Sequence, residues 1–346
     1  MNSDFLIVGA GVIGLSSALE LIQRGARVTV LERGEVGQES SWAGGGILSP
    51  LCPWDYSDEV TRLASRGAEL FPAWAQALHT ATGIDPEYEM SGMLVLPPFD
   101  AQAAQQWCAA HDVPLQQVKA EDCALPVPSD ALYLPQVAQV RNPRLMRALR
   151  SRVEMLGGRI IEQCEARGIV VENGLVRAFA TSSGELSAEN FIVSAGAWSK
   201  QVLGQYALQM DIKPMRGQML LFKFAEPPLR HIVLQGDLYL IPRRDGHLLV
   251  GSTLEDAGFD KSITQAAYDH LRLRAEAVLP QLRDMPLMQH WAGLRPASPH
   301  NIPIIGRHPQ LHNLYINSGH FRYGVTMATA SVEILLHEII NAPQSC

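Results

Sequence analysis

Three glycines and one acidic residue near the N-terminus have the spacing of a phosphate-binding turn. Gly9, Gly11 and Gly14 form the pattern Gly-x-Gly-x-x-Gly, and Glu32 follows about 20 residues further on. The first glycine permits a tight turn, the second lets a pyrophosphate approach the backbone, and the third lets a helix pack on a strand. Glu32 could accept a hydrogen bond from a ribose hydroxyl. The spacing predicts a dinucleotide site. The alternative is a glycine turn that only packs a helix against a strand.

The elements around this turn have the order that such a site needs. Residues 5–8 are apolar and predict a short buried strand. Residues 12–23 have helical spacing of apolar side chains, and residues 27–31 predict a second strand with Glu32 at its tip. The helix N-terminus would then hold the diphosphate through its backbone N–H groups. We therefore expect a strand–helix–strand unit at the start of the chain.

Two further segments favour a flavin over a nicotinamide. Gly44, Gly45 and Gly46 end the run Ser-Ser-Trp-Ala-Gly-Gly-Gly, and glycines let a backbone lie flat against a large planar ligand. A flexible loop is the alternative for this run. Residues 318–324 join a predicted strand to the last predicted helix, over residues 325–340. The positive N-terminus of that helix could face the N1/O2 edge of a flavin, where reduction builds negative charge.

A single arginine ends an apolar run near the C-terminal end. Residues 290–296 read His-Trp-Ala-Gly-Leu-Arg-Pro, which predicts a strand that delivers Arg295 toward the site. A guanidinium is costly to bury without a paired anion. That anion is either a carboxylate of this chain, in a structural salt bridge, or a carboxylate of a bound ligand.

Composition limits the class of protein. The 346 residues favour two domains, and the net charge of −7 without a Lys/Arg block disfavours nucleic-acid binding and a polybasic membrane patch. No apolar run approaches the roughly 20 residues that span a bilayer. The five cysteines are widely spaced and form no Cys-x-x-Cys pair. This pattern predicts reduced thiols in a cytoplasmic protein and no metal site.

The rest of the chain mixes helices with antiparallel strands. Asn142 and Pro143 predict a helix start, with Asn142 as N-cap. Asn173-Gly174 predicts a tight hairpin turn, and short strands from residue 214 onward predict an antiparallel sheet. Proline-rich stretches around residues 97–98 and 126–135 predict irregular loops and edge strands. Further helices are expected over residues 59–78, 142–156 and 264–278.

Motifs spread over almost the whole chain resemble those of the D-amino-acid-oxidase-type FAD oxidoreductases. They are GAGVIG (9–14) with Glu32, SSWAGGGILSP (40–50), SAGAWS (194–199), YLIPRRDGHLLVGST (239–253), WAGLRP (291–296), PIIGRHP (303–309) and GHFRYG (319–324). The resemblance implies an α/β fold with a Rossmann-like FAD-binding domain built from discontinuous segments and an inserted α+β substrate domain with a large antiparallel sheet. We expect the first domain over residues 1–84, 141–212 and 291–346, and the second over residues 85–140 and 213–290.

The resemblance also implies which residues bind the cofactor. We expect noncovalent FAD, because residues 293–298 contain no cysteine where related sarcosine oxidases attach the flavin. The implied FAD contacts are Gly9, Gly11, Gly14, Glu32, Arg33, Ser41, Gly44, Gly45, Gly46, Gly196, Arg322, Tyr323, Gly324 and Val325.

For the substrate, the resemblance assigns roles to three residues. Arg295 would pair with a carboxylate through two hydrogen bonds, Tyr239 would donate its hydroxyl to the same group, and the backbone carbonyl of Arg322 would accept from the amine. The implied reaction is oxidative deamination of glycine or another small amino acid by hydride transfer to flavin N5, with O2 as acceptor and H2O2 as product. It needs no acid–base residue, so the histidines are interpreted as structural. We expect it to serve thiamine thiazole synthesis.

Other functions stay open. Asp237 and Leu254 differ from the residues of *Bacillus*-type relatives and are expected to border the pocket, so the substrate is not settled. A D-amino-acid dehydrogenase or oxidase with a larger pocket is the nearest alternative. An NAD-dependent dehydrogenase and a non-catalytic dinucleotide-binding subunit are alternatives of other classes. The resemblance suggests a homo-oligomer.

Overall fold

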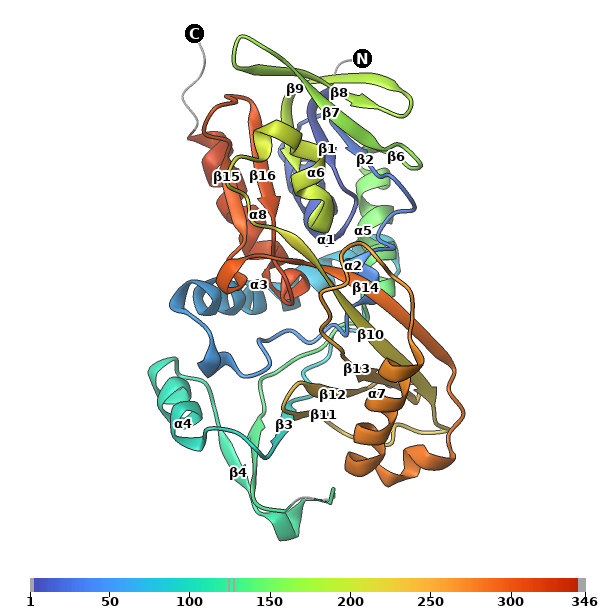
Figure 1. The fold of residues 1–346 in the computed structure, drawn as a ribbon. Helices are drawn as coiled ribbons and strands as arrows, with labels where there is room; N and C mark the ends of the chain where they lie inside the picture. The colour runs from blue at the N-terminus through green and yellow to red at the C-terminus, as the bar shows by residue number, and fades with distance from the viewer. Residues whose placement is uncertain (1–2, 124, 127, 342–346) are drawn as a thin grey trace.

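Two eight-stranded sheets form the framework of the protein. The computed structural model describes residues 3–123, 125–126 and 128–341. The first sheet lies in the upper half of Figure 1 and the second in the lower half. The chain passes from the first sheet to the second and back twice, so segments far apart in sequence share each sheet. This confirms the α/β fold class with a discontinuous Rossmann-like part.

The first sheet is largely parallel and has the strand order β15-β16-β9-β1-β2-β6. β1 lies at its centre, parallel to β2 on one side and to β9 on the other. β7 and β8 form a hairpin that extends β9, and their turn is Asn173-Gly174 as the sequence predicts. The strands are β1 (Ser3–Val8), β2 (Val28–Leu31), β6 (Arg159–Ile161), β7 (Ala166–Glu172), β8 (Leu175–Thr181), β9 (Gly184–Val193), β15 (Ile304–Arg307) and β16 (Leu314–Ser318).

Both faces of the first sheet are covered, which explains why its strands are continuous apolar runs. Phe5 and Ile7 of β1 pack on one face against a layer of three helices, α1 (Val12–Gln23), α5 (Asn142–Met155) and α8 (Gly324–Ile340). Leu6 and Val8 point to the other face and pack near Phe179 of β8 and α6 (Ser199–Leu203). This alternation buries every side chain of the strand end that leads into the glycine turn.

The second sheet is mostly antiparallel and has the order β14-β10-β13-β12-β11-β3-β5-β4. One face packs against α7 and the other against α4. β14 begins before residue 291 and pairs with β10, so it crosses one predicted domain boundary; the domain division itself stays a prediction. The strands are β3 (Met93–Leu96), β4 (Gln116–Val118), β5 (Ala131–Leu134), β10 (Lys213–Lys223), β11 (Ile232–Gln235), β12 (Leu238–Pro242), β13 (His247–Gly251) and β14 (Gln289–Ala297).

The long helices follow the predicted spacing with two differences, and two short helices, residues 40–43 and 199–203, were not predicted. α5 begins at Asn142 itself, with Arg141 in the N-cap position, so Asn142 is not the cap. Its side-chain amide makes no hydrogen bond to any of the described residues. α4 stands where proline-rich flanks predicted irregular structure, because Asp100 caps it by accepting from Ala103 N–H at 2.9 Å. The helices are α1 (Val12–Gln23), α2 (Ser40–Ala43), α3 (Asp58–Thr82), α4 (Ala101–Ala110), α5 (Asn142–Met155), α6 (Ser199–Leu203), α7 (Gln265–Val278) and α8 (Gly324–Ile340).

Candidate active site

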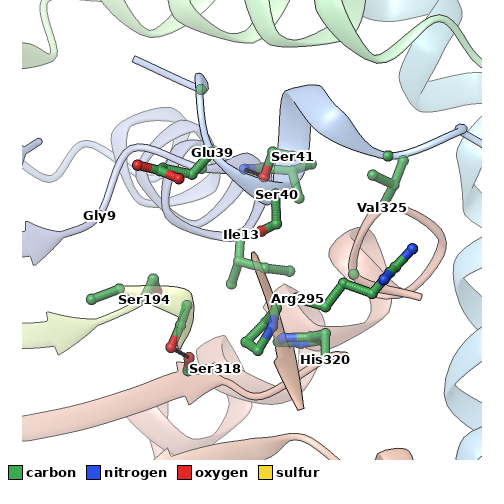
Figure 2. A pocket seen from close by; sticks show the side chains of 18 of the residues that line it. Gly9, Ile13, Glu39, Ser40, Ser41, Ser194, Arg295, Ser318, His320 and Val325 are labelled. Atoms are coloured by element: carbon green, nitrogen blue, oxygen red, sulfur yellow. Dashed lines mark hydrogen bonds between the residues drawn. The ribbon is translucent and has the colours of Figure 1, made fainter. Parts of the chain in front are cut away.

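A cavity of about 420 Å³ lies at the carboxyl ends of β1, β2, β9 and β16 and reaches the second sheet. Ligands of open α/β sheets bind at this edge, where the strand order reverses. Figure 2 shows side chains from the N-terminal segments, from the end of β9 and from the C-terminal part around it. The structure brings all predicted site residues but Gly14 to the lining: Gly9, Gly11, Glu32, Arg33, Ser41, Gly44, Gly45, Gly46, Gly196, Tyr239, Arg295, Arg322, Tyr323, Gly324 and Val325.

The three glycines of the turn are required for different reasons. Gly9 has φ +106°, and a Cβ there would lie 2.4 Å from the carbonyl oxygen of Ser194. Gly14 lies behind the turn, where a Cβ would be 1.9 Å from the carbonyl oxygen of Gly9. It therefore sets the distance between α1 and β1 and does not line the cavity. A Cβ on Gly11 would be 3.0 Å from Ser41 Oγ, so this glycine leaves the helix N-terminus accessible.

Glu32 and Ser41 hold the backbone of this turn. Glu32 accepts hydrogen bonds from Ala10 N–H and Gly34 N–H, each at 3.0 Å. Ser41 Oγ accepts from the N–H of Val12, the first residue of α1, at 2.9 Å. Both side chains also line the cavity, so they can shape the phosphate-binding turn and meet a ligand. The contact between Glu32 and a ribose hydroxyl stays a prediction.

Beside the predicted contacts Glu32 and Arg33, the cavity lining contains Glu39 and Trp198, which the sequence did not assign. The Arg33 guanidinium lies 3.5 Å from the ring centroid of Trp198, and it pairs with Glu39 at 2.7 Å. Glu39 also pairs with Lys261 at 3.0 Å. Trp198 stands in the motif SAGAWS, but its place beside Arg33 depends on β9 lying next to β1. No local pattern reports that neighbourhood.

Arg243 supports the triple-glycine segment from behind. Arg243 is 4% exposed, and its guanidinium donates to Gly45 O at 2.7 Å, Val140 O at 3.0 Å and Gln139 Oε1 at 2.7 Å. Burial lowers the pKa of Arg243 to about 10. In the sequence, Arg243 precedes a polar hairpin turn and resembles a solvent-exposed residue. Only the packing of β12 against this segment identifies it.

Arg295 reaches the cavity from β14 without a carboxylate partner among the described residues. Its guanidinium donates to Thr253 O at 3.2 Å and to Ser252 Oγ at 2.6 Å, both neutral acceptors. Burial lowers its pKa, and the positive charge of Arg322 acts in the same direction. The structural salt bridge considered for Arg295 is therefore absent from the described part of the chain.

Two tyrosines lie at the same end of the cavity. Tyr239 on β12 is 8% exposed, and its hydroxyl lies 3.8 Å from Met219 Sδ, which is a weak acceptor. Tyr323 donates to the hydroxyl of Tyr56, and burial raises the pKa of Tyr323 well above its ordinary value. The Tyr323 phenol is thus a protonated donor near neutral pH. Tyr239 has no stronger acceptor among the described residues.

Two residues expected at the pocket lie away from it. Asp237 forms an ion pair with Arg274 of α7 at 2.7 Å, and its side chain is 58% exposed. Leu254 is 44% exposed. Neither belongs to the cavity lining. The expectation that they border the pocket is wrong, because β12 and the loop after β13 turn these side chains outward.

His320 is a buried neutral base under the C-terminal loop. It is 2% exposed, its Nε2 lies 2.8 Å from Ser331 Oγ of α8, and burial lowers its pKa to about 3. The ring therefore connects the loop to the helix that follows it, and it carries no charge near neutral pH.

His320 predicts a pH dependence of stability. Its folded-state pKa lies below the unfolded value of 6.5, so its contribution is complete above pH 6.5 and is lost as the pH falls toward 3. Each pH unit within this window lowers the free energy of unfolding by about 1.4 kcal/mol. Urea unfolding of the wild type and of His320→Gln, at about pH 7 and about pH 5, measures this. The difference between the two proteins should shrink at the lower pH; a constant difference would contradict the burial argument.

The lining of the cavity has the groups that a dinucleotide needs. It includes the glycine turn and the start of α1, Glu32 and Arg33 after β2, and the glycines of residues 44–46, of which Gly45 lies beside Tyr239. Ser194 and Asn317, at the ends of β9 and β16, are buried with side-chain polar atoms that have no partner in the described residues. Polar atoms left without partners at a cavity are typical of a site that a ligand completes.

The described residues contain neither a cluster typical of a metal site nor a helix typical of a membrane span. No cluster of three or more His, Cys, Asp or Glu side chains that could hold a metal was found there. None of the described helices has the length and apolar character needed to cross a membrane.

Known proteins resemble this chain over nearly its full length. The family model described as FAD dependent oxidoreductase matches residues 4–337. Glycine oxidase of *Pseudomonas aeruginosa* is 45% identical over 97% of this chain and 94% of its own length. Bifunctional protein ThiO/ThiG of *Trichormus variabilis* is 30% identical over 99% of this chain and 53% of its own length. The crystal structure of glycine oxidase from *Bacillus cereus* has a TM-score of 0.91 at 26% identity and covers 99% of this chain and 96% of that one.

Proposed function

We infer the function from one premise: the chain belongs to the family of FAD-dependent oxidoreductases, so its cofactor is FAD. We propose that it oxidises glycine or another small amino acid that has a free carboxylate. The relatives named glycine oxidase support this substrate class. We further propose that FAD is bound without a covalent link by the glycine turn, Glu32 and the glycines of residues 44–46.

The observation that carries the proposal is the environment of Arg295. The guanidinium of Arg295 is partly buried, and its hydrogen bonds to Thr253 O and Ser252 Oγ supply no negative charge, so it lacks the anion that would compensate its burial. A substrate carboxylate supplies that anion and matches the fork of the guanidinium. The hydroxyl of Tyr239, which lies near only a weak acceptor, would donate to the same carboxylate. The site therefore selects amines that carry a carboxylate.

The protein contributes orientation and a dry site. When bound, FAD supplies the hydride acceptor for oxidation of the substrate carbon. Arg295 and Tyr239 hold the carboxylate, and the backbone carbonyl of Arg322 accepts from the neutral amine, which fixes the α-carbon. The N-terminus of α8 directs its partial positive charge toward the cavity. No side chain is required as acid or base, and His320 stays neutral and structural.

The overall reaction that we propose consumes O2 and water. Glycine loses two electrons and two protons to give the imine, and water converts the imine to glyoxylate and ammonia. O2 takes up the two electrons and two protons and becomes H2O2. We propose that the product serves thiamine thiazole synthesis, with the relative named ThiO/ThiG as support. A homo-oligomer and a cytoplasmic location stay predictions.

A substrate panel tests the proposal. The purified protein, loaded with FAD, is assayed with glycine, sarcosine, D-alanine and D-proline, and H2O2 formation is compared with reduction of an artificial dye. We expect a yellow protein that forms H2O2 with glycine or sarcosine as the best substrates. Higher kcat/KM with D-alanine or D-proline, or dye reduction without H2O2, would instead indicate a D-amino-acid oxidase or dehydrogenase. A protein that does not bind FAD would contradict the whole assignment.

A further inference from the structure

Gly217 on β10 leaves the space that the Arg295 guanidinium occupies. β10 and β14 are antiparallel neighbours, with Met215 opposite Arg295 and Gly217 opposite Gly293. A Cβ built on Gly217 would lie 1.9 Å from Nη1, 2.3 Å from Cζ and 2.3 Å from Nη2 of Arg295. The backbone of Gly217 does not have a left-handed conformation, so a larger residue is excluded by the guanidinium and not by φ.

The two neighbours of Gly217 hold one carboxylate. Arg216 pairs with Glu255 Oε2 at 2.6 Å, and Gln218 Nε2 donates to Glu255 Oε1 at 2.8 Å. The backbones of Arg216 and Glu255 exchange two hydrogen bonds of 2.9 Å each. Arg216 also pairs with Asp260 at 2.7 Å, and its side chain is only 8% exposed. The start of the loop after β13 is therefore fastened to β10 by backbone and side-chain bonds.

The fastened loop is the one that receives Arg295. Gln218 N–H donates to Thr253 Oγ1 at 2.9 Å, and Thr253 Oγ1 in turn donates to Glu255 Oε1 at 2.5 Å. Thr253 O and Ser252 Oγ then accept the two hydrogen bonds from the Arg295 guanidinium. Arg295 thus lies over Gly217, and the loop after β13 accepts hydrogen bonds from its guanidinium nitrogens. Arg216 and Gln218, on either side of Gly217, anchor that loop.

We propose that the tripeptide Arg216-Gly217-Gln218 is a positioning element for Arg295, with Gly217 as its decisive residue. The inference rests on the proposed role of Arg295 in binding the substrate carboxylate. An arginine side chain has many rotamers, and fixing one of them before the substrate arrives lowers the entropy lost on binding. Gly217 supplies the space. Glu255, held by Arg216 and Gln218, anchors the loop whose Thr253 O and Ser252 Oγ are the fixed acceptors.

Gly217→Ala tests this positioning role. The added methyl group must displace the guanidinium, so we expect KM for glycine to rise at least about tenfold, the loss expected for a weakened charge-assisted bond. The Kd for FAD should stay unchanged, because Gly217 does not line the cavity. Gly168→Ala is the matched control: Gly168 also lies in a strand, β7, and a Cβ there would meet nothing within 4 Å. Its KM should equal that of the wild type.

A double-mutant cycle separates positioning from a general packing defect. If Gly217 acts through Arg295, Gly217→Ala adds no further increase in KM to an Arg295→Met protein. Affinity for acetate, followed by the change it causes in the flavin absorption spectrum, gives a second readout that needs no turnover. If Gly217→Ala fails to fold, Glu255→Gln is the second variant. It weakens the anchor of the loop, but Asp260 still pairs with Arg216, so Glu255→Gln should raise KM by a smaller factor than Gly217→Ala.

The KM values of these variants distinguish the positioning role of Gly217 from the carboxylate-binding role of Arg295. Increased KM in both Arg295→Met and Gly217→Ala, without additivity, supports the positioning element. Increased KM in Arg295→Met alone, with Gly217→Ala and Glu255→Gln like the wild type, overturns the positioning role and leaves the proposed function intact. An unchanged KM in Arg295→Met overturns the carboxylate site itself.

Discussion

Replacing Arg295 with methionine is expected to raise KM for glycine about 10- to 150-fold, while FAD stays bound. This range corresponds to the loss of a charge-assisted pair worth about 1.5–3 kcal/mol. Met keeps the aliphatic length of the side chain and removes the guanidinium that meets the substrate carboxylate. Steady-state kinetics with glycine, together with titration of the apoprotein with FAD, measures both quantities.

A second arginine, in the turn between β12 and β13, provides the control for this experiment. Arg244 follows β12, pairs with Glu89 at 3.0 Å, and its side chain is 52% exposed. Arg244→Met removes the same positive charge away from the cavity and should leave KM near the wild-type value. If the two variants have equal KM values, Arg295 holds the structure together and does not bind the substrate.

Gly14→Ala is expected to yield a protein that does not retain FAD. The new Cβ would lie 1.9 Å from the carbonyl oxygen of Gly9, so α1 must move away from β1 or the turn must change shape. Overpacking of this kind costs about 1–3 kcal/mol or more, and here it also moves the N–H groups that would hold the diphosphate. The absorbance ratio of flavin to protein after purification, and the urea midpoint of the apoprotein, measure the two effects.

Gly34→Ala is the matched control for this variant. Gly34 lies three residues after the end of β2, close to the same unit, and the heavy atom nearest to a new Cβ would be Glu32 Oε1 at 3.9 Å. We expect Gly34→Ala to bind FAD like the wild type. Retention of the full flavin content by Gly14→Ala would show that the turn tolerates a wider spacing between α1 and β1 than its geometry indicates.

The elements that the sequence predicted well are those whose signals are local. Signals within a few positions, namely the apolar period, turn residues and caps, predicted three elements. These are the strand–helix–strand unit of residues 5–31, the Asn173-Gly174 turn and α7, which ends at Val278. α4 was missed because its residues are mainly alanine and glutamine, with a weak apolar period between proline-rich flanks. Asn142 was misplaced by one position, which is within the usual uncertainty of helix ends.

For the site, the motifs named the lining residues but not their supports. Glycine spacing, an acid at a strand tip and an arginine after an apolar strand are patterns that chemistry imposes on the sequence itself. Arg243 and Trp198 gave no such signal, because their partners lie in segments about 198 and 165 residues away, Gly45 and Arg33. Contacts of this range depend on which strands become neighbours.

The sequence alone predicted a glycine turn for a dinucleotide at residues 9–14 and a C-terminal loop at residues 318–324 that suits a flavin. It also predicted that Arg295 needs an anionic partner. These are properties of residue type and short spacing, which backbone geometry translates directly into local structure. Only the tertiary structure decided that Arg295 has no carboxylate partner among the described residues. It also decided that Gly217 and the loop after β13 orient the Arg295 side chain. That arrangement arises from the pairing of β10 with β14 and β13, and strand pairing between distant segments is set by packing of the whole sheet.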